Sequence, residues 1–514
     1  MSEQIDGLNL LADLGTGGAR LRLCSSKTGA WVGDPVEVPW KTYQDTEGGG
    51  HIVMFGQSAG RTFAQALQKL IQANQTVADD KSRPLVAIGI GGHMHALFAV
   101  EADGQIAVPV QMWNSSAAAA DGEALSKAAQ WKIDRRLTAS HLRRLMRGAD
   151  PAFDATKVKF ISTCAGYIGH LLTGVNGVGP CEGSGLGFND PATGMVSDKV
   201  IASVAGTADN AELVKSWLPK ILEPGEILGE VSEWSPLLSV LPEHWRKAIV
   251  AAPEGDQAMG RIALCRGPED VSLVLGSSLV ATTVAPQWGS RVDPTGTVDF
   301  FTDPQGLPMA MGLVTVGMRV GDRFVQEFAN ERFGGKVGSD VFAKLERLAR
   351  EEMPISAEDF GVTFPVRDPA LGISKPFEVA PPKAVSAGVQ WNLILLQVAA
   401  CIAIRLKQLI GNSNVSQLIL GGAAARDNLL AEYIANATGI KVFRPEGGQD
   451  AMLVGARSLA MATTAVHSGA APFTKALAAL RTPQSGTTFS PSEPLQSLVH
   501  SHVEWVRKAI TNNH

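Results

Sequence analysis

The chain has 514 residues, which is too long for one ordinary hydrophobic core. At roughly 100–200 residues per domain, about two to four structural units are expected. The composition, with 45% hydrophobic and 18% charged residues, is typical of a soluble globular protein. The formal net charge of −5 excludes a general basic field of the kind that holds nucleic acid or an anionic membrane, so we expect neither partner.

The cysteines are widely spaced, and none forms a CxxC pair. Their number is odd, so the sequence predicts neither a zinc site nor a disulfide framework, and buried reduced thiols are expected. The five residues are Cys24, Cys164, Cys181, Cys265 and Cys401.

The N-terminal residues lack the basic segment and long apolar run of a signal peptide. The most apolar internal stretch, residues 393–404, is interrupted by Gln397 and falls short of the roughly 20 residues that cross a bilayer. We therefore expect a buried core helix at this stretch and a cytoplasmic location for the protein.

The first half of the chain combines strands with helices. An apolar run, a glycine turn and a strand of alternating pattern predict a β-hairpin near the N-terminus. A helical pattern and a buried strand follow, which indicates an α/β chain. The predicted elements are a hairpin at 8–25, a helix at 57–78, a strand at 85–90, a hairpin at 99–106, and a more helical, less regular region at 115–245.

The second half repeats this organisation. Its predicted elements are a strand at 248–252 leading into a helix, a hairpin at 271–284, a strand at 417–420, a helix at 428–438 and a terminal amphipathic helix at 496–510. Because a glycine-containing hairpin occurs in each half, we predict two related α/β domains, each presenting a turn of phosphate size. We divide the chain into an N-terminal domain at 1–247, a C-terminal domain at 248–480, and a tail at 481–514.

The first hairpin turn contains Gly15, Thr16 and Gly17. Consecutive backbone N–H groups in such a turn can form a concave anion site, and Thr16 adds a hydroxyl donor. Asp13, just before the turn, is placed to hold Mg²⁺ directly or through water. The alternative is an ordinary tight hairpin, which this turn alone does not rule out.

The second hairpin turn, Gly276-Ser277-Ser278, follows the same reasoning. Either turn alone is weak evidence for phosphate binding. Two such turns, one in each half, favour a nucleotide held between two domains, because its phosphates then need contacts from both.

A third glycine segment follows the strand at 417–420 and contains Gly421, Gly422, Ala423 and Arg426. Small residues there allow a ribose or a flat ring to lie against the backbone, and a following helix N-terminus favours negative charge. The segment matches neither the Walker pattern nor a dinucleotide fingerprint. The alternative is close packing between a strand and a helix.

Asp256 comes just after a predicted strand and a glycine, at the start of a helix. An Asp in this position is often only an N-cap, which stabilises a helix by about 1 kcal/mol. The functional interpretation is a base that accepts the proton of an attacking hydroxyl. Phosphoryl transfer depends mainly on positioning and charge neutralisation, so one carboxylate, two phosphate turns and Mg²⁺ form a sufficient set.

Polar and aromatic residues that suit a polyol lie between the two turns. His93 and His95 flank Met94, and we expect them to form a polar pocket wall rather than a metal pair, because imidazole can donate to or accept from sugar hydroxyls. Trp113 and Asn114 add an aromatic face and an amide, which is a common way to hold a sugar.

In this order, the segments resemble the FGGY family of carbohydrate kinases, and xylulokinases (pentulose kinases) in particular. The resemblance runs from residue 13 to about residue 460, and six motifs in family order carry it. They are the segments 13–17, 92–95, 112–114, 255–258, 275–278 and 421–424.

The resemblance implies two actin-like (ribonuclease H-like) α/β domains with ATP and the sugar in the cleft between them, a need for Mg²⁺, and closure on binding. It makes Asp256 the catalytic base. It also makes Met94, His95, Asp256 and Gln257 sugar contacts, and it assigns the segment at 421–424 to adenosine. A homodimer is allowed by analogy, since dimers are common in the family.

The departures from the family pattern lie on the sugar side. Ser115-Ser116-Ala117 follows Trp113-Asn114 where xylulokinases continue with Asp-Gly-Arg, and His93 replaces a Gln. The leading hypothesis is ATP-dependent phosphorylation of a primary hydroxyl of a ketopentose such as xylulose. The alternatives are a kinase of another ketose or sugar alcohol, and a non-catalytic actin-like nucleotide sensor.

Overall fold

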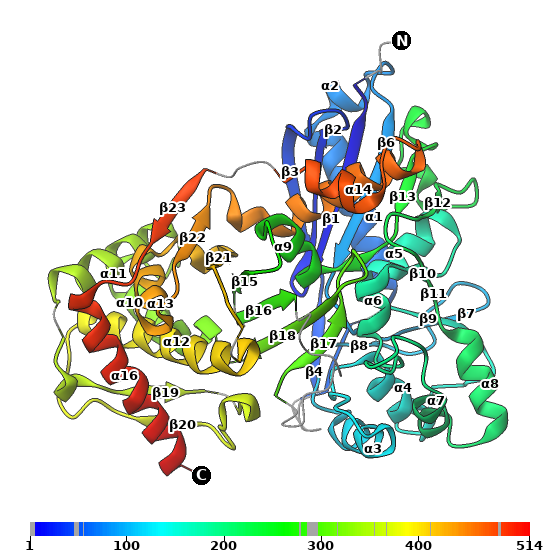
Figure 1. The fold of residues 1–514 in the computed structure, drawn as a ribbon. Coiled ribbons are helices and arrows are strands. Elements are labelled where there is room, and N and C mark those ends of the chain that lie inside the picture. Colours follow the sequence, from blue (N-terminus) through cyan, green and yellow to red (C-terminus); the bar gives the residue numbers. More distant parts are fainter. Residues whose placement is uncertain are drawn as a thin grey trace.

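The computed structural model describes residues 6–45, 51–54, 56–276, 279–284, 297–315, 317–353, 355–365, 367–411, 413–481 and 485–513. Two seven-stranded sheets, one in each half of the chain, form the centres of two α/β units (Figure 1). This arrangement confirms the predicted fold class.

The first sheet has the order β12-β13-β6-β1-β2-β3, and β14 pairs with β6 beyond β13. Its central strand, β1, is almost continuously apolar, as expected for a strand that is buried on both faces. The strands are β1 (Leu8–Gly15), β2 (Gly18–Ser25), β3 (Trp31–Pro39), β6 (Leu85–Gly92), β12 (Ile227–Glu230), β13 (Ile249–Ala251) and β14 (Glu254–Gly255).

The second sheet has the order β17-β18-β16-β15-β21-β22-β23. Like the first, it begins with an antiparallel hairpin, β15–β16, whose first strand also pairs in parallel with a later strand, β21. The strands are β15 (Asp270–Leu275), β16 (Leu279–Val284), β17 (Asp299–Thr302), β18 (Pro308–Val314), β21 (Gln417–Gly421), β22 (Val442–Pro445) and β23 (Gly486–Phe489).

Helices and small sheets cover these two sheets. The helices are α1 (Gly56–Ala73), α2 (Gln75–Ala78), α3 (Ala119–Ala129), α4 (Thr138–Met146), α5 (Cys164–Thr173), α6 (Pro180–Gly185), α7 (Asp198–Ala205), α8 (Ala208–Trp217), α9 (Asp256–Leu264), α10 (Asp322–Arg332), α11 (Ser339–Glu351), α12 (Ala387–Ile410), α13 (Asn428–Thr438), α14 (Ala451–His467), α15 (Phe473–Ala479) and α16 (Glu493–Asn512). The small sheets contain β4 (Thr42–Asp45), β5 (His51–Met54) and β8 (Val110–Gln111); β7 (Phe98–Glu101) and β9 (Val158–Ser162); β10 (Gly177–Val178) and β11 (Lys220–Ile221); and β19 (Val362–Phe364) and β20 (Phe377–Val379).

Two helices connect the units. α9 leaves the first sheet at Asp256 and leads to the second, and α14 packs on α9 and across β1 and β6 (Figure 1). The first sheet also includes β13 and β14, so the boundary placed at residue 248 lies before the last strands of that sheet. The segment separated as a tail belongs to the second unit, because β23 pairs with β22 and α16 packs on α12 and α13.

One other expectation needs correction, and one is confirmed. The helix predicted at 57–78 is divided at Asn74 into α1 and α2. The Asn74 side-chain amide accepts the backbone N–H of Asp34 and donates to its carbonyl oxygen, which ties this break to β3. The hairpin predicted at 99–106 is present: Ala107 N–H donates to the carbonyl oxygen of Ala99 at 2.9 Å and Glu101 N–H to that of Gln105 at 2.8 Å, although β7 pairs along its length with β9.

The apolar stretch at 393–404 lies within α12, as predicted. Among the described helices, α12 is the one that is long and apolar enough to cross a membrane, but 72% of its most apolar window is buried inside the protein. It packs against α11, α13 and α16, which is the behaviour of a core helix. All five cysteines are buried and free, as expected.

Candidate active site

The candidate site forms where neighbouring parallel strands of the first sheet end. In the register of the sheet, Gly91 of β6 pairs with Asp13 of β1 on one side and with Glu254 of β14 on the other. Asp256 follows one residue after β14, as the first residue of α9. The carboxyl ends of these strands therefore bring Asp13 and Asp256 to the same edge of the sheet.

The turn between β1 and β2 is open above its glycines. A Cβ atom added to Gly15 or Gly17 would meet nothing within 4 Å. Thr16, which lies between the two glycines, is held by two indole N–H groups. Trp40 Nε1 donates to its carbonyl oxygen at 2.9 Å, and Trp113 Nε1 donates to its hydroxyl at 3.0 Å. The Thr16 hydroxyl keeps its own hydrogen to donate to an anion.

Asp13 is paired with an arginine directly across the hairpin. Arg20 donates to the Asp13 carboxylate at 3.0 Å and to the Asp450 carboxylate at 3.1 Å. Burial nevertheless raises the pKa of Asp13 above its ordinary value, although the charge of Arg20 opposes this. The arginine thus compensates only part of the cost of a buried carboxylate.

Asp256 is a strongly perturbed carboxyl group. Burial, and secondly the charge of Asp13, raises its pKa to about 7. Its oxygen Oδ1 accepts the backbone N–H of Gln257 at 2.7 Å, and the residue at the N-cap position is Gly255. The interpretation of Asp256 as an N-cap therefore does not apply, whereas a pKa near 7 suits a general base.

The donor set fits a hard divalent cation. Asp13 and Asp256 leave negative charge at one edge of the sheet that Arg20 only partly neutralises, as the raised pKa values show. Among the described residues, no group of three His, Cys, Asp or Glu side chains forms a metal site alone. A cation held by Asp13 would therefore complete its shell with water and phosphate oxygens, as Mg²⁺ commonly does.

His93 and His95 each bond a backbone carbonyl oxygen. His93 Nδ1 donates to the carbonyl oxygen of Leu14 at 3.1 Å, and His95 Nδ1 donates to that of Gly185 at 2.7 Å. Burial lowers the pKa of His93 to about 4 and that of His95 to about 3, so both rings are neutral at pH 7. Met94 between them is 4% exposed and packs toward Gly255.

Three of the predicted sugar contacts carry unused buried polar atoms. Nε2 of His93, Oδ1 of Asn114 and Oε1 of Gln257 have no hydrogen-bond partner among the described residues. Because Nδ1 of His93 donates its hydrogen, Nε2 of the neutral ring is an acceptor. All three atoms are therefore acceptors, which suits a ligand that presents hydroxyl groups.

Two of the predicted nucleotide-binding segments, the one that begins at Gly276 and the one that begins at Gly421, follow neighbouring strands of the second sheet. Val274, two residues before Gly276, pairs with Gly421, and a Cβ atom on Gly422 would lie 2.5 Å from the carbonyl oxygen of Leu275. Ser277 and Ser278 lie outside the described residues. This close approach and the φ of 86° both require a glycine at position 422. Contact between these glycine segments and a ligand stays a prediction.

The segment after Gly422 is a 3-10 turn, η6 (Ala423–Arg426), and not the start of the helix. Ala423 and Arg426 are exposed on this turn. α13 begins two residues later, with Asp427 as its N-cap accepting the backbone N–H of Leu430 at 2.9 Å. A ligand at this edge would therefore face the 3-10 turn.

Two buried glutamates of the site were missed by the sequence analysis. Glu254 accepts the backbone N–H groups of Cys181 and Glu182, both at 3.1 Å. Glu182 is 0% exposed, and its Oε2 would lie 3.3 Å from a Cβ atom on Gly255. The only signal in the sequence was a glutamate between small residues, and that pattern does not distinguish a buried carboxyl from an exposed one.

Glu182 is a protonated acid at neutral pH. Burial raises its pKa to about 8, and the charge of Asp256 adds to the shift. The Thr163 hydroxyl is close enough to oppose the shift, yet within the described chain neither carboxyl oxygen of Glu182 has a partner in hydrogen-bonding geometry. The neutral carboxyl group of Glu182 therefore lies near Asp256, the candidate base.

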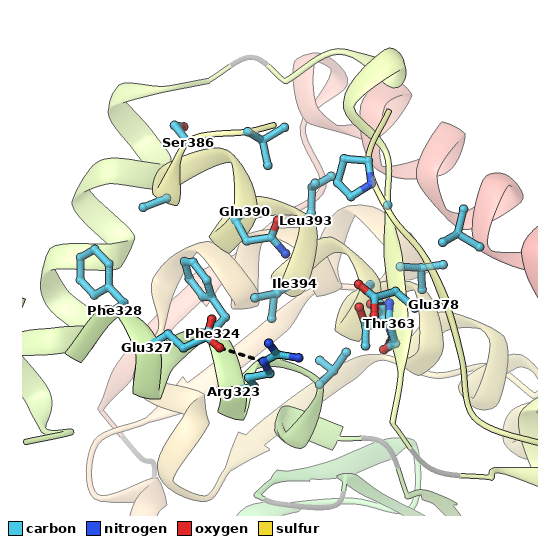
Figure 2. Close-up of a pocket in the computed structure, with 18 of the residues that line it drawn as sticks. Arg323, Phe324, Glu327, Phe328, Thr363, Glu378, Ser386, Gln390, Leu393 and Ile394 are labelled. Atoms are coloured by element: carbon cyan, nitrogen blue, oxygen red, sulfur yellow. Dashed lines mark hydrogen bonds and ion pairs between the residues drawn. The ribbon is translucent and has the colours of Figure 1, made fainter. Parts of the chain in front are cut away.

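A cavity of about 510 Å³ lies elsewhere, on the second unit between α10, α12 and the β19–β20 hairpin (Figure 2). Its rim carries an ion pair between Arg323 and Glu327 at 2.8 Å, in which the arginine side chain is 90% exposed. No residue of the candidate site lines it. We place the active site by the perturbed carboxylates, because cavity volume alone does not identify chemistry.

The chain is similar to known sugar kinases. No family model matches the chain. A curated xylulose kinase from Streptomyces coelicolor is 27% identical over 274 residues, which is 51% of this chain and 53% of that protein. The chain therefore spans about half the length of the curated relatives it matches, and the match confirms the resemblance to xylulose kinases.

Solved structures match over nearly the whole length. A xylulose kinase from Lactobacillus acidophilus has a TM-score of 0.76 at 15% identity and covers 98% of both chains. A Plasmodium falciparum glycerol kinase with ADP has a TM-score of 0.77 at 12% identity and covers 99% of both chains. The fold is that of the sugar kinases. Because kinases with different substrates share this sugar-kinase fold to a similar degree, the fold does not select the sugar.

Proposed function

We propose that the protein is an ATP-dependent kinase that phosphorylates a primary hydroxyl of a small sugar, namely a ketopentose such as xylulose, with Asp256 as general base. The observation that carries the proposal is the pair of partly buried carboxylates, Asp13 and Asp256, which β1 and β14 bring to one edge of the first sheet on either side of β6, beside an open glycine turn. One of them has a pKa raised to about 7, where a base is most effective at neutral pH.

In this mechanism Asp256 accepts the proton of the sugar hydroxyl while the hydroxyl oxygen forms its bond to the terminal phosphorus of ATP. The bond from that phosphorus to the bridging oxygen breaks, and ADP leaves. The backbone of the turn at Gly15–Gly17 and the Thr16 hydroxyl orient phosphate oxygens. Asp13 would hold Mg²⁺, which when bound neutralises the charge on the phosphates.

In this proposal, polar side chains near Asp256 hold the sugar. The acceptor atoms of His93, Asn114 and Gln257 lack partners in the described protein, so they are available to sugar hydroxyl donors. Trp113 supplies an aromatic face while its N–H fixes Thr16. Met94 and His95 act through packing, because Met94 lies against Gly255 and His95 is bonded to Gly185.

The choice of a ketopentose rests on the matched xylulose kinases. A cytoplasmic location, and assembly as a homodimer, are further proposals that rest on the same resemblance. The changes after Asn114 fall within the sugar-binding side, and sites that hydrogen-bond a substrate discriminate strongly between hydroxyl patterns. Another ketose or a sugar alcohol is therefore the first alternative within this proposal.

A screen of ADP release tests the proposal. Purified full-length protein with ATP and Mg²⁺ is expected to release ADP only in the presence of one or a few members of a panel of ketopentoses, ketohexoses, heptuloses and sugar alcohols. ATP binding without turnover on any member would contradict the kinase and favour a nucleotide sensor.

A further inference from the structure

A second pocket, of about 200 Å³, lies where the two units meet. Its walls come from Trp31 at the start of β3, the end of α9, the turn between β22 and α14, α14 itself and the end of α15. The volume is below the roughly 300–1,000 Å³ of typical sites for drug-sized ligands. An occupant would therefore be smaller than a nucleotide.

Arginines dominate the polar lining of this pocket, which includes Arg266, Arg457 and Arg481. Arg457 donates to the carbonyl oxygen of Gly29 and Arg481 to that of Arg266, each at 2.9 Å, and neither forms a salt bridge with a carboxylate of the described residues. Burial lowers the pKa of both arginines, and Nε of Arg481 is buried without an acceptor in the part of the chain that is described. Asp270 and Asp303 act on Arg481 without forming an ion pair with it, and neither carboxylate lines the pocket.

The carboxylates in the lining do not offset this charge. Asp450 is already held by Arg20 at 3.1 Å and by Arg22 at 3.8 Å, neither of which lines the pocket. Glu446 accepts a hydrogen bond from the hydroxyl of Ser485 and is the remaining acid of the lining. Arg457 and Arg481 therefore outnumber Glu446, the one acid of the lining that no arginine holds, and leave the pocket with an excess of positive charge.

The pocket is also preorganised. The Trp31 ring contacts two guanidinium groups, with Arg22 at 4.2 Å and Arg457 at 5.0 Å from its centre, and this contact restricts the direction of Arg457. Gly447, with a φ of 75°, would have nothing within 4 Å of an added Cβ atom, so a ligand can approach the backbone there. Fixed donors bind an anion without first losing side-chain freedom.

We propose that this pocket binds a phosphate group, as inorganic phosphate or as the phosphate of a small ester, through Arg457 and Arg481. The planar guanidinium fork matches two phosphate oxygens, which makes arginine the usual residue for this recognition. The pocket shares no lining residue with the candidate active site, and Asp450 in its wall reaches Asp13 only through Arg20. It does not depend on the proposed kinase reaction.

Isothermal titration calorimetry on the full-length protein tests this site, with inorganic phosphate and a pentose monophosphate as separate probes at constant ionic strength. Arg481→Gln is expected to weaken binding at least about tenfold, because a charge-assisted bidentate contact is lost. Arg481→Lys, which keeps the charge without the fork, should give an intermediate loss. Arg457→Gln is a second variant, and its thermal unfolding shows whether it is folded.

Two controls separate this pocket from other anion sites. Arg323→Gln removes an exposed arginine from another surface, and Thr16→Val alters the proposed phosphate turn; neither should change phosphate binding here. Loss of binding in the arginine variants supports the proposal, and the probe that binds identifies the free ion or the ester as ligand. Unchanged affinity in Arg481→Gln, absence of binding by either probe, or loss only in Thr16→Val overturns it.

Discussion

The charge of Asp13 raises the pKa of Asp256, although one residue lies near the end of β1 and the other begins α9. The sheet register creates this relationship, because β6 lies between β1 and β14 and aligns their carboxyl ends. A pair of largely desolvated carboxylates costs stability, and proteins retain such pairs mainly where they serve chemistry. The pair is therefore the centre of the functional account.

Replacing Asp13 with asparagine removes a negative charge next to Asp256 and should lower the pKa of Asp256 from about 7. Because the base works only when ionised, the acid limb of the kcat/KM profile should move to lower pH. The profile is measured at saturating Mg²⁺. Glu37→Gln removes a charge that acts on Asp13 and is not among the groups that shift Asp256, so it should leave the limb in place. A limb that stays or moves to higher pH in Asp13→Asn would refute this electrostatic coupling.

Glu182 should make the stability of the protein depend on pH. Its pKa is raised from 4.5 to about 8 on folding, so the folded state binds the proton more tightly and its contribution to stability is lost as pH rises through this range. Glu182→Gln cannot ionise. Relative to the wild type, it should gain up to about 1.4 kcal/mol of unfolding free energy per pH unit between roughly pH 5 and 8.

Urea unfolding of both proteins at pH 5 and pH 8 checks this. The control is Glu212→Gln, which removes a glutamate that is 80% exposed and should show no such trend. A difference between Glu182→Gln and wild type that is constant with pH would mean that Glu182 is ionised in the folded protein.

Trp113→Phe keeps the aromatic face but removes the N–H that fixes the Thr16 hydroxyl. Loss of one hydrogen bond costs about 1 kcal/mol, so KM for ATP should rise about fivefold, with KM for the sugar nearly unchanged. Steady-state kinetics with each substrate varied in turn measures this. Trp234→Phe, at a residue that is 86% exposed, is the matched control. A rise confined to KM for the sugar would show that the indole N–H serves the sugar and not the phosphate turn.

Local signals in the sequence were sufficient for many elements. The glycine turn and alternating pattern gave the β1–β2 hairpin, and the helix predicted at 428–438 has the bounds of α13. In both places short-range chemistry, a turn or a cap, decides the structure. The order of the motifs likewise indicated the fold class.

Local sequence patterns do not predict contacts between segments that are far apart in the chain. The pairing of β13 and β14 with β6, and the return of α14 to the first sheet, depend on how whole elements pack, so the boundary was placed too early. Glu182 was missed because a single sequence does not show that a carboxyl group is fully buried beside Asp256.

Sugar-dependent ADP formation by Asp256→Asn, compared with wild type, tests the central claim most directly. Asp198→Asn is the control, since Asp198 is 85% exposed. On whichever sugar the wild type accepts, Asp256→Asn should lose turnover on the order of 10²–10⁴-fold while keeping its melting temperature, and Asp198→Asn should lose neither. Near-normal turnover in Asp256→Asn would contradict the assignment of Asp256 as the base.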